Sequence, residues 1–92
     1  NTGLETTKSG VYPKNLKDFK NFCIHEMKLN IVGLMCIPPI NEDPKIHFTI
    51  LQNLGIENDI RELSIGMSND YKEAIDFDPE YIRLGTILFG KR

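Results

Sequence analysis

Two short runs of small and hydroxyl-bearing residues, Gly66-Met67-Ser68 and Gly85-Thr86, each follow an apolar stretch of the chain. Each run supplies backbone N–H groups, a glycine that permits close approach, and a hydroxyl. Ser68 is also a natural N-cap, and a helix N-terminus has unpaired N–H donors and a positive partial charge. Together the two runs predict a phosphate site. A plain N-cap at Ser68 and a tight turn at Gly85 are the alternatives that involve no ligand.

Two charged residues lie close to these runs. Arg83 follows Ile82 in an apolar strand and shares a strand face with Gly85. A guanidinium among apolar residues should be paired, because a lone buried charge is costly. Arg83 is therefore interpreted either as part of a structural ion pair or as a donor to a ligand beside the phosphate. Asp70 suits a helix N-terminus but would repel a phosphate, so we expect its side chain to point away.

The cysteines and histidines do not have the spacing of a metal site. Cys23 and Cys36 are far apart and outside any CxxC motif, so we predict that both are buried apolar residues. Reduced thiols of this kind indicate a reducing compartment, the cytoplasm. His25 and His47 have no cysteine or histidine at ligand spacing, and no metal site is predicted.

The composition is that of one small globular domain. The 92 residues are 40% hydrophobic and 26% charged, with a net charge of −2. This charge does not suggest a nucleic acid or an anionic membrane surface as a partner. No apolar run has the length that a bilayer span needs. The lysines at three-residue spacing, Lys14, Lys17 and Lys20, are interpreted as a solvated helix face.

The hydrophobic pattern alternates between strands and helices. Apolar residues at helical spacing predict helices over Lys14–Lys28, Pro44–Leu54 and Asn69–Phe77, with Gly55 ending the second. Short apolar runs predict strands over Ile31–Ile37, Glu62–Ile65 and Tyr81–Leu84. Asn1–Gly3 is read as the end of an earlier strand, and Thr86–Gly90 as the start of a last helix. This order predicts an α/β fold with a parallel sheet and crossover helices.

The predicted phosphate site has the position that such sites take in barrels, after the last two strands and at their C-terminal ends. A (β/α)8 barrel takes about 250 residues, so the chain fits the C-terminal part of a TIM barrel, or else a small open sheet. The start at Asn1 rather than Met indicates a piece of a longer protein, with a processed terminus as the alternative. Half a barrel would expose two sheet edges, so we expect the absent N-terminal half, or another copy of the chain, as partner.

Four stretches in order resemble the YggS/PROSC pyridoxal-phosphate-binding proteins and cover nearly the whole chain. They are NTGLETTKSG at 1–10, GLMCIPP at 33–39, LSIGMSNDYKEAI at 63–75 and YIRLGTILFGKR at 81–92. The departures are mild, with Ile65 in place of the usual methionine and Cys36 in place of threonine or alanine. Residues 78–80 also differ, in a loop expected on the face away from the cofactor.

The resemblance implies that residues 1–92 are the C-terminal portion of a single barrel domain of the alanine racemase N-terminal type, which binds pyridoxal 5′-phosphate (PLP). It implies that Ser68, Gly85 and Thr86 hold the phosphate, with the N–H groups of Met67 and Ser68 as further donors. It also implies that Arg83 lies near the pyridine nitrogen. No catalytic residue is implied.

The resemblance also implies a role in PLP homeostasis, as a cofactor carrier or buffer rather than a strong catalyst. An arginine beside the pyridine nitrogen keeps it unprotonated and weakens the ring as an electron sink. One alternative is a racemase-like PLP enzyme, but such enzymes carry a large β-domain after the barrel, whereas this chain ends at Arg92. The other is an incomplete fragment that does not bind PLP alone, because the family's cofactor-bonding lysine would lie upstream of Asn1. Lys8 matches a lysine at the site mouth, where it either contacts the cofactor or is solvated.

Overall fold

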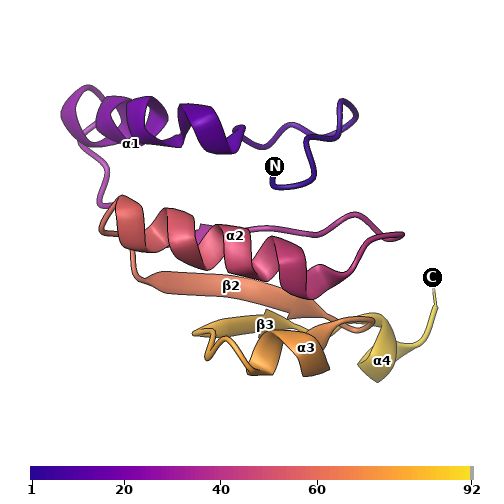
Figure 1. Cartoon of the computed structure of the whole chain (residues 1–92). Helices are drawn as coiled ribbons and strands as arrows, with labels where there is room; N and C mark the ends of the chain where they lie inside the picture. The colour runs from indigo at the N-terminus through magenta and orange to yellow at the C-terminus, as the bar shows by residue number, and fades with distance from the viewer. Residues whose placement is uncertain (92) are drawn as a thin grey trace.

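Figure 1 shows the computed structural model of the chain, which describes residues 1–91. Arg92, the last residue of the matched C-terminal motif, lies outside the described part. The elements in order are η1 (Pro13–Asn15), α1 (Leu16–His25), β1 (Gly33–Met35), α2 (Pro44–Glu57), β2 (Glu62–Met67), α3 (Tyr71–Ile75), β3 (Tyr81–Arg83) and α4 (Thr86–Phe89).

The three strands form one parallel sheet in the order β1-β2-β3. Each strand therefore lies beside the next one in the chain. The connecting helices α2 and α3 contact the strands that they link and also each other, so both lie on one face of the sheet. The predicted α/β architecture with a parallel sheet is confirmed.

The hydrophobic core lies between the sheet and these two helices. It consists of side chains from β2, from α2, from α3 and from the segment after β1: Leu63, Ile65, Phe48, Leu51, Ala74 and Cys36. The Phe48 ring also meets Phe77 edge to face, with centroids 5.6 Å apart. The opposite face of the sheet has no helix on it in the described residues, and Met35 is 55% exposed there. The functional side chains described below gather on that barer side.

The helix α2 begins as predicted but does not end as predicted. Its N-cap is Asp43, whose carboxylate accepts a hydrogen bond from the Lys45 N–H at 3.0 Å. Gly55 was expected to stop the helix, and this is wrong, because the helix continues for two more residues. The missing side chain of Gly55 serves close packing instead. Its carbonyl accepts the Ile60 N–H at 2.8 Å, and a Cβ at Gly55 would collide with the Ile60 carbonyl oxygen.

The other predicted helices and strands are present, most of them shorter than the sequence indicated, whereas β2 extends two residues beyond the predicted end at Ile65. The helix predicted for Lys14–Lys28 is observed as η1 and α1, and Lys28 has a positive φ of 55° that a helix cannot include. The strand predicted for Ile31–Ile37 contracts to β1, whose three residues pair with β2. The strand expected at Asn1–Gly3 is wrong, because these residues form a turn outside the sheet.

The helix α1 lies apart from the sheet, on the far side of α2 (Figure 1). Within residues 1–91, no helix combines the length and apolar character needed to cross a membrane.

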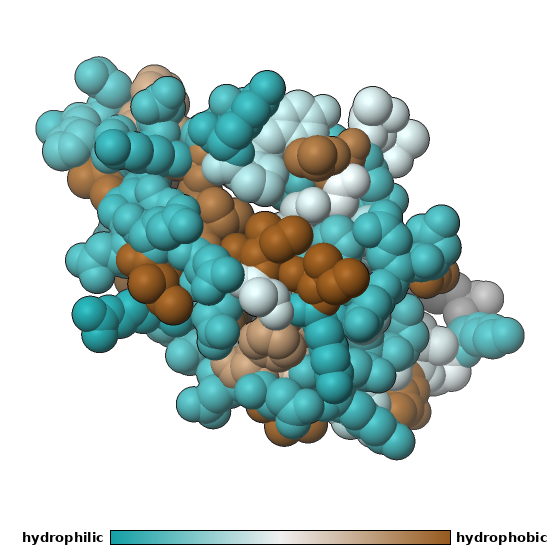
Figure 2. Space-filling model, viewed as in Figure 1, coloured by the Kyte–Doolittle hydropathy of each residue, from teal (hydrophilic) through white to brown (hydrophobic). Residues whose placement is uncertain are grey.

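Figure 2, which has the same viewpoint as Figure 1, shows apolar side chains exposed across the middle of the molecule, over α2. On that helix Ile46 is 56% exposed and Ile56 is 74% exposed. The apolar surface of α2 is therefore only partly used by the core.

Candidate functional site

A pocket of about 800 Å³ opens where β2 and β3 end and α4 begins. Its lining includes all five residues predicted for the ligand site: Met67, Ser68, Arg83, Gly85 and Thr86. The volume is within the range of small-molecule sites, roughly 300–1,000 Å³. The structure thus brings the two predicted runs together at the C-terminal ends of adjacent parallel strands.

Gly66 makes the end of β2 possible. Its φ is +99°, a conformation that side chains strongly disfavour, and the pairing of β2 with β3 shifts register between Ser64 and Met67. Helix α3 lies directly against it, since a Cβ at Gly66 would be 2.9 Å from the Ala74 Cβ. The strand can turn into the pocket loop here because this residue has no side chain.

Ser68 does not cap α3, and that prediction is wrong. The helix begins at Tyr71, and its N-cap is Asp70, which makes no side-chain capping bond. The Ser68 hydroxyl instead accepts a hydrogen bond from the Ile87 N–H at 3.0 Å, in the first turn of α4. Ser68 therefore links the loop after β2 to the helix after β3, rather than serving the helix that follows it in the chain.

Asp70 points away from the pocket, as expected, and is not part of its lining. Its carboxylate accepts the Met67 N–H at 2.7 Å, and its own N–H donates to the Met67 carbonyl at 3.1 Å. Only 8% of Asp70 is exposed. The Met67 N–H, which the family resemblance assigns to the phosphate, is thus already bonded to Asp70 in this structure.

The second run offers groups that are free for a ligand. A Cβ built on Gly85 would meet no atom within 4 Å, so this residue borders open space. In residues 1–91, the N–H groups of Gly85 and Thr86 donate no hydrogen bond. An anion placed over this turn could accept both N–H groups, with little steric hindrance at Gly85.

Arg83 lies across the barer face of the sheet. From β3, its Nη2 donates to the carbonyl of Ser64 in β2 and to that of Cys36 after β1, each at 3.3 Å. The expectation that the guanidinium is paired is confirmed, with carbonyl oxygens as partners rather than a carboxylate. Its Nε is buried and has no hydrogen-bond partner among the described residues. An unsatisfied buried donor beside a pocket indicates room for an acceptor.

Cys36 and Cys23 are both free and buried, as predicted. Burial raises the pKa of the Cys36 thiol above its usual value, although the Thr2 side chain and the Arg83 charge oppose the shift. The thiol therefore stays protonated at neutral pH and behaves as a small apolar group. No group of three histidine, cysteine or acidic residues in the described part could hold a metal ion.

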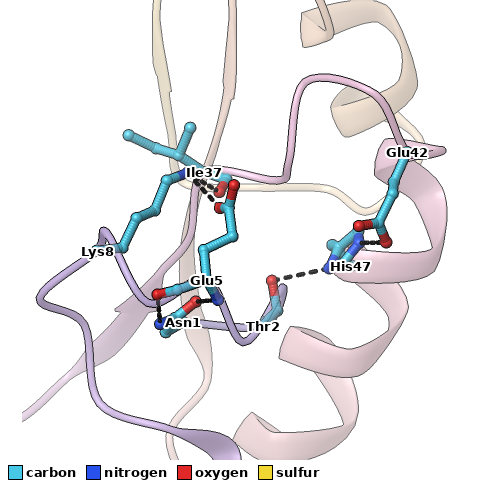
Figure 3. Close-up of polar contacts among 7 residues, drawn as sticks. All are labelled: Asn1, Thr2, Glu5, Lys8, Ile37, Glu42 and His47. Atoms are coloured by element: carbon cyan, nitrogen blue, oxygen red, sulfur yellow. Dashed lines mark hydrogen bonds and ion pairs between the residues drawn. The ribbon is translucent and has the colours of Figure 1, made fainter.

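A second polar cluster joins the N-terminal loop to α2, and the sequence did not indicate it. Figure 3 shows His47 between two partners, with Nδ1 3.0 Å from the Thr2 hydroxyl and Nε2 3.0 Å from a Glu42 carboxylate oxygen. Only 3% of His47 is exposed. A histidine within the apolar pattern of α2 was the available signal, but its partner Thr2 is 45 residues away.

Lys8 lies in the same loop (Figure 3). It is not among the residues that line the 800 Å³ pocket. Its ammonium is 3.0 Å from the Ile37 carbonyl oxygen and 3.0 Å from a Glu5 carboxylate oxygen. Asn1 braces the loop, because its side chain bonds both the N–H and the carbonyl of Glu5. Lys8 also borders a groove of about 470 Å³ that shares Met67 with the pocket.

No family model matches the chain. Several curated proteins named pyridoxal phosphate homeostasis protein do match. The Aquifex aeolicus protein is 38% identical over 101 residues, which cover the whole chain and 44% of that protein. The Synechocystis protein is 45% identical over 73 residues, which cover 70% of the chain and 34% of that protein. The Schizosaccharomyces pombe protein is 33% identical over a match that covers the whole chain and 43% of that protein.

The chain thus spans less than half the length of these curated relatives. The matches to the bacterial and yeast proteins extend over the whole chain and include the two strand ends that form the pocket. The chain belongs to the YggS/PROSC family of pyridoxal phosphate homeostasis proteins and corresponds to the C-terminal portion of its members.

Proposed function

We propose that this chain is the C-terminal portion of a single PLP-binding (β/α)8 barrel domain and serves PLP homeostasis as a cofactor carrier or buffer. The observation that carries the proposal is the pocket at the ends of β2 and β3, which gathers all five predicted residues. The relatives are named for PLP homeostasis, which supports the choice of ligand. The two free buried cysteines favour the cytoplasm as the compartment.

The sheet has the arrangement that a barrel segment requires. Consecutive strands are neighbours and parallel, and both crossover helices lie on one face. In a barrel, that face would be the outer surface, and the face with Arg83 would be the interior. The greater length of the relatives leaves room for the remaining strands. We propose that an N-terminal half, or a second copy of the chain, pairs with the open edges.

The phosphate fits the groups around Ser68 and Gly85. Because the Ser68 oxygen accepts the Ile87 N–H, its own hydroxyl hydrogen can be donated to a phosphate oxygen. The free N–H groups of Gly85 and Thr86 supply two more donors. Asp70, the nearest acid in the loop, is turned away and occupied by Met67. The arrangement favours an anion without placing a carboxylate against it.

Arg83 suits the ring nitrogen of the ligand. Bound PLP supplies an aldehyde that reacts with amines and a pyridine ring that can accept electrons. The guanidinium has no acceptor capacity and stays protonated, so it can only donate to the nitrogen. Its unpartnered Nε and its place in the pocket lining are consistent with that role. An unprotonated ring nitrogen favours storage and delivery over carbanion chemistry.

The test is a calorimetric titration of the chain with PLP, which measures the affinity in the absence and presence of inorganic phosphate as a competitor. Ser68→Ala should weaken PLP binding roughly tenfold or more, because it removes a hydrogen bond to a charged group. Ser9→Ala removes a hydroxyl from an exposed loop residue and should leave the affinity unchanged. Equal affinity of Ser68→Ala and wild type would contradict the proposed site.

Native mass spectrometry of the purified chain tests the partner. A species at a multiple of 10.5 kDa that carries PLP would support pairing of copies around the ligand. A folded 10.5 kDa monomer without affinity for PLP would contradict binding by this part of the protein, and the fragment alternative would replace it.

A further inference from the structure

We propose that Asp70 is a positioning residue of the PLP pocket. Its buried carboxylate holds the turn from Met67 to Asp70 in the shape that presents the Ser68 hydroxyl to α4 and to the phosphate. The proposal rests on the function proposed above and names the residue that shapes its site. Asp70 would not contact the ligand itself, because it lies outside the pocket lining.

The turn is closed by two bonds between the same pair of residues. The Asp70 carboxylate accepts the Met67 N–H at 2.7 Å, and the Asp70 N–H donates to the Met67 carbonyl at 3.1 Å. The first is short for a bond from an N–H group, as expected for a charged acceptor. The Asp70 carbonyl also accepts the Ala74 N–H at 3.1 Å, and Ala74 is fully buried in the core. The turn is therefore tied to a rigid part of the fold.

Ser68 lies within this turn, so the turn decides where its hydroxyl points. The hydroxyl accepts the Ile87 N–H at 3.0 Å, which is the one side-chain hydrogen bond between the turn and α4 in residues 1–91. Packing contributes little there, because Ile87, Leu88 and Phe89 are 52%, 66% and 86% exposed. The position of α4, and of the free N–H groups at its start, therefore depends on Ser68 and through it on Asp70.

The acceptor oxygen and the negative charge of Asp70 have opposite effects on the site. The oxygen satisfies the Met67 N–H, whereas the charge, two residues from Ser68, disfavours a phosphate nearby. Asp70→Asn keeps an acceptor oxygen and removes the charge, and Asp70→Ala removes both. Comparing the two variants separates the positioning of the turn from the electrostatic effect.

The first experiment is amide hydrogen exchange of the ligand-free chain, read by NMR at Met67 and Ile87. Asp70→Ala should speed exchange at both amides. At Ile87 the increase should be about tenfold, because one hydrogen bond is lost. Asp70→Asn should change both by less than about threefold, because the acceptor remains. Asp76→Asn removes an exposed charge at the C-terminal end of α3 and should change the exchange rate at neither amide. Ser68→Ala should speed exchange at Ile87 and leave Met67 unchanged.

The second experiment measures PLP affinity in the same variants. Asp70→Ala should bind about tenfold more weakly, and Asp70→Asn should bind as tightly as the wild type or more tightly. Unchanged exchange at Ile87 in folded Asp70→Ala would overturn the proposal. If Asp70→Ala does not fold, Asp70→Glu takes its place, because its longer side chain displaces the acceptor oxygen while keeping the charge. Faster exchange at Met67 without faster exchange at Ile87 in that variant would overturn the proposal. If the wild type binds no PLP but the variants show the expected changes in exchange, the proposed function is refuted. The role of Asp70 in holding the turn then still stands.

Discussion

The substitution Gly66→Ala offers the most direct test of how the chain builds the end of β2. Gly66 has a φ of +99°, and the place that a Cβ would take is already filled. The added atom would be 2.9 Å from the Ala74 Cβ, 3.2 Å from Ile82 Cγ2 and 3.3 Å from the Tyr71 Cα. Two of these three atoms belong to α3, so a single methyl group would push the helix away from the sheet.

The cost can be worked out from these two effects. A residue with a side chain in a left-handed conformation costs about 1–2 kcal/mol relative to glycine. Overpacking against a well-ordered core costs about 1–3 kcal/mol more, since Ala74 is fully buried and cannot turn aside. Their sum is about 2–5 kcal/mol, a large part of the 5–15 kcal/mol that holds a typical domain together.

The assay is urea denaturation followed by circular dichroism, with Gly85→Ala as the matched control. Gly85 has a φ of −119°, and a Cβ there would meet nothing within 4 Å, so its substitution should change the free energy of unfolding by less than about 1 kcal/mol. The same control should weaken PLP binding, because its methyl group would stand in the pocket. A Gly66→Ala chain as stable as Gly85→Ala would refute the assigned conformation and packing of β2 and α3.

Three further predictions concern side chains in and around the site. His47→Leu should lower the free energy of unfolding by about 1–3 kcal/mol, because it leaves the buried Thr2 hydroxyl without its histidine partner. The control in the same denaturation assay is Thr49→Ala, on the exposed side of α2. Arg83→Met should lower the free energy of unfolding by about 1–2 kcal/mol, because it removes two hydrogen bonds to carbonyl groups. It should also weaken PLP binding. A calorimetric affinity equal to that of the wild type would exclude the contact between Arg83 and the ring. Cys36 should make stability fall as the pH rises above about 9, since burial raises its thiol pKa in the folded state and the unfolded chain loses the proton first. Cys36→Ala should reduce that slope in denaturation curves measured across pH, and an identical slope would contradict the assignment.

The sequence could place the five residues that line the pocket at neighbouring strand ends because their signals are local. A glycine and a hydroxyl directly after an apolar strand identify a strand end, whatever the rest of the chain does. Parallel strands then bring their C-terminal ends to one edge, so Ser68 and Gly85 had to be close once the β/α order was correct. Arg83 was predictable for the same reason, as a charge in an apolar strand that needs partners.

The remaining features depend on contacts that no local pattern contains. Ser68 looked like an N-cap because it precedes a helix, but the turn closed by Asp70 delays that helix to Tyr71 and gives the hydroxyl to Ile87, 19 residues on. The bond from Thr2 to His47 spans 45 residues and has no period in the sequence.

The position of Arg83 has a consequence for how ligand binding could be observed. One guanidinium nitrogen holds the carbonyls of Cys36 and Ser64, while another has no partner among the described residues. An acceptor that takes the free nitrogen would draw electron density through the delocalised group and alter both carbonyl bonds. Carbon-13 labels at those two carbonyls, on different strands, would then report occupancy by a change in infrared stretching frequency. Arg83 would thus report ligand binding through the two carbonyl groups to which it donates hydrogen bonds.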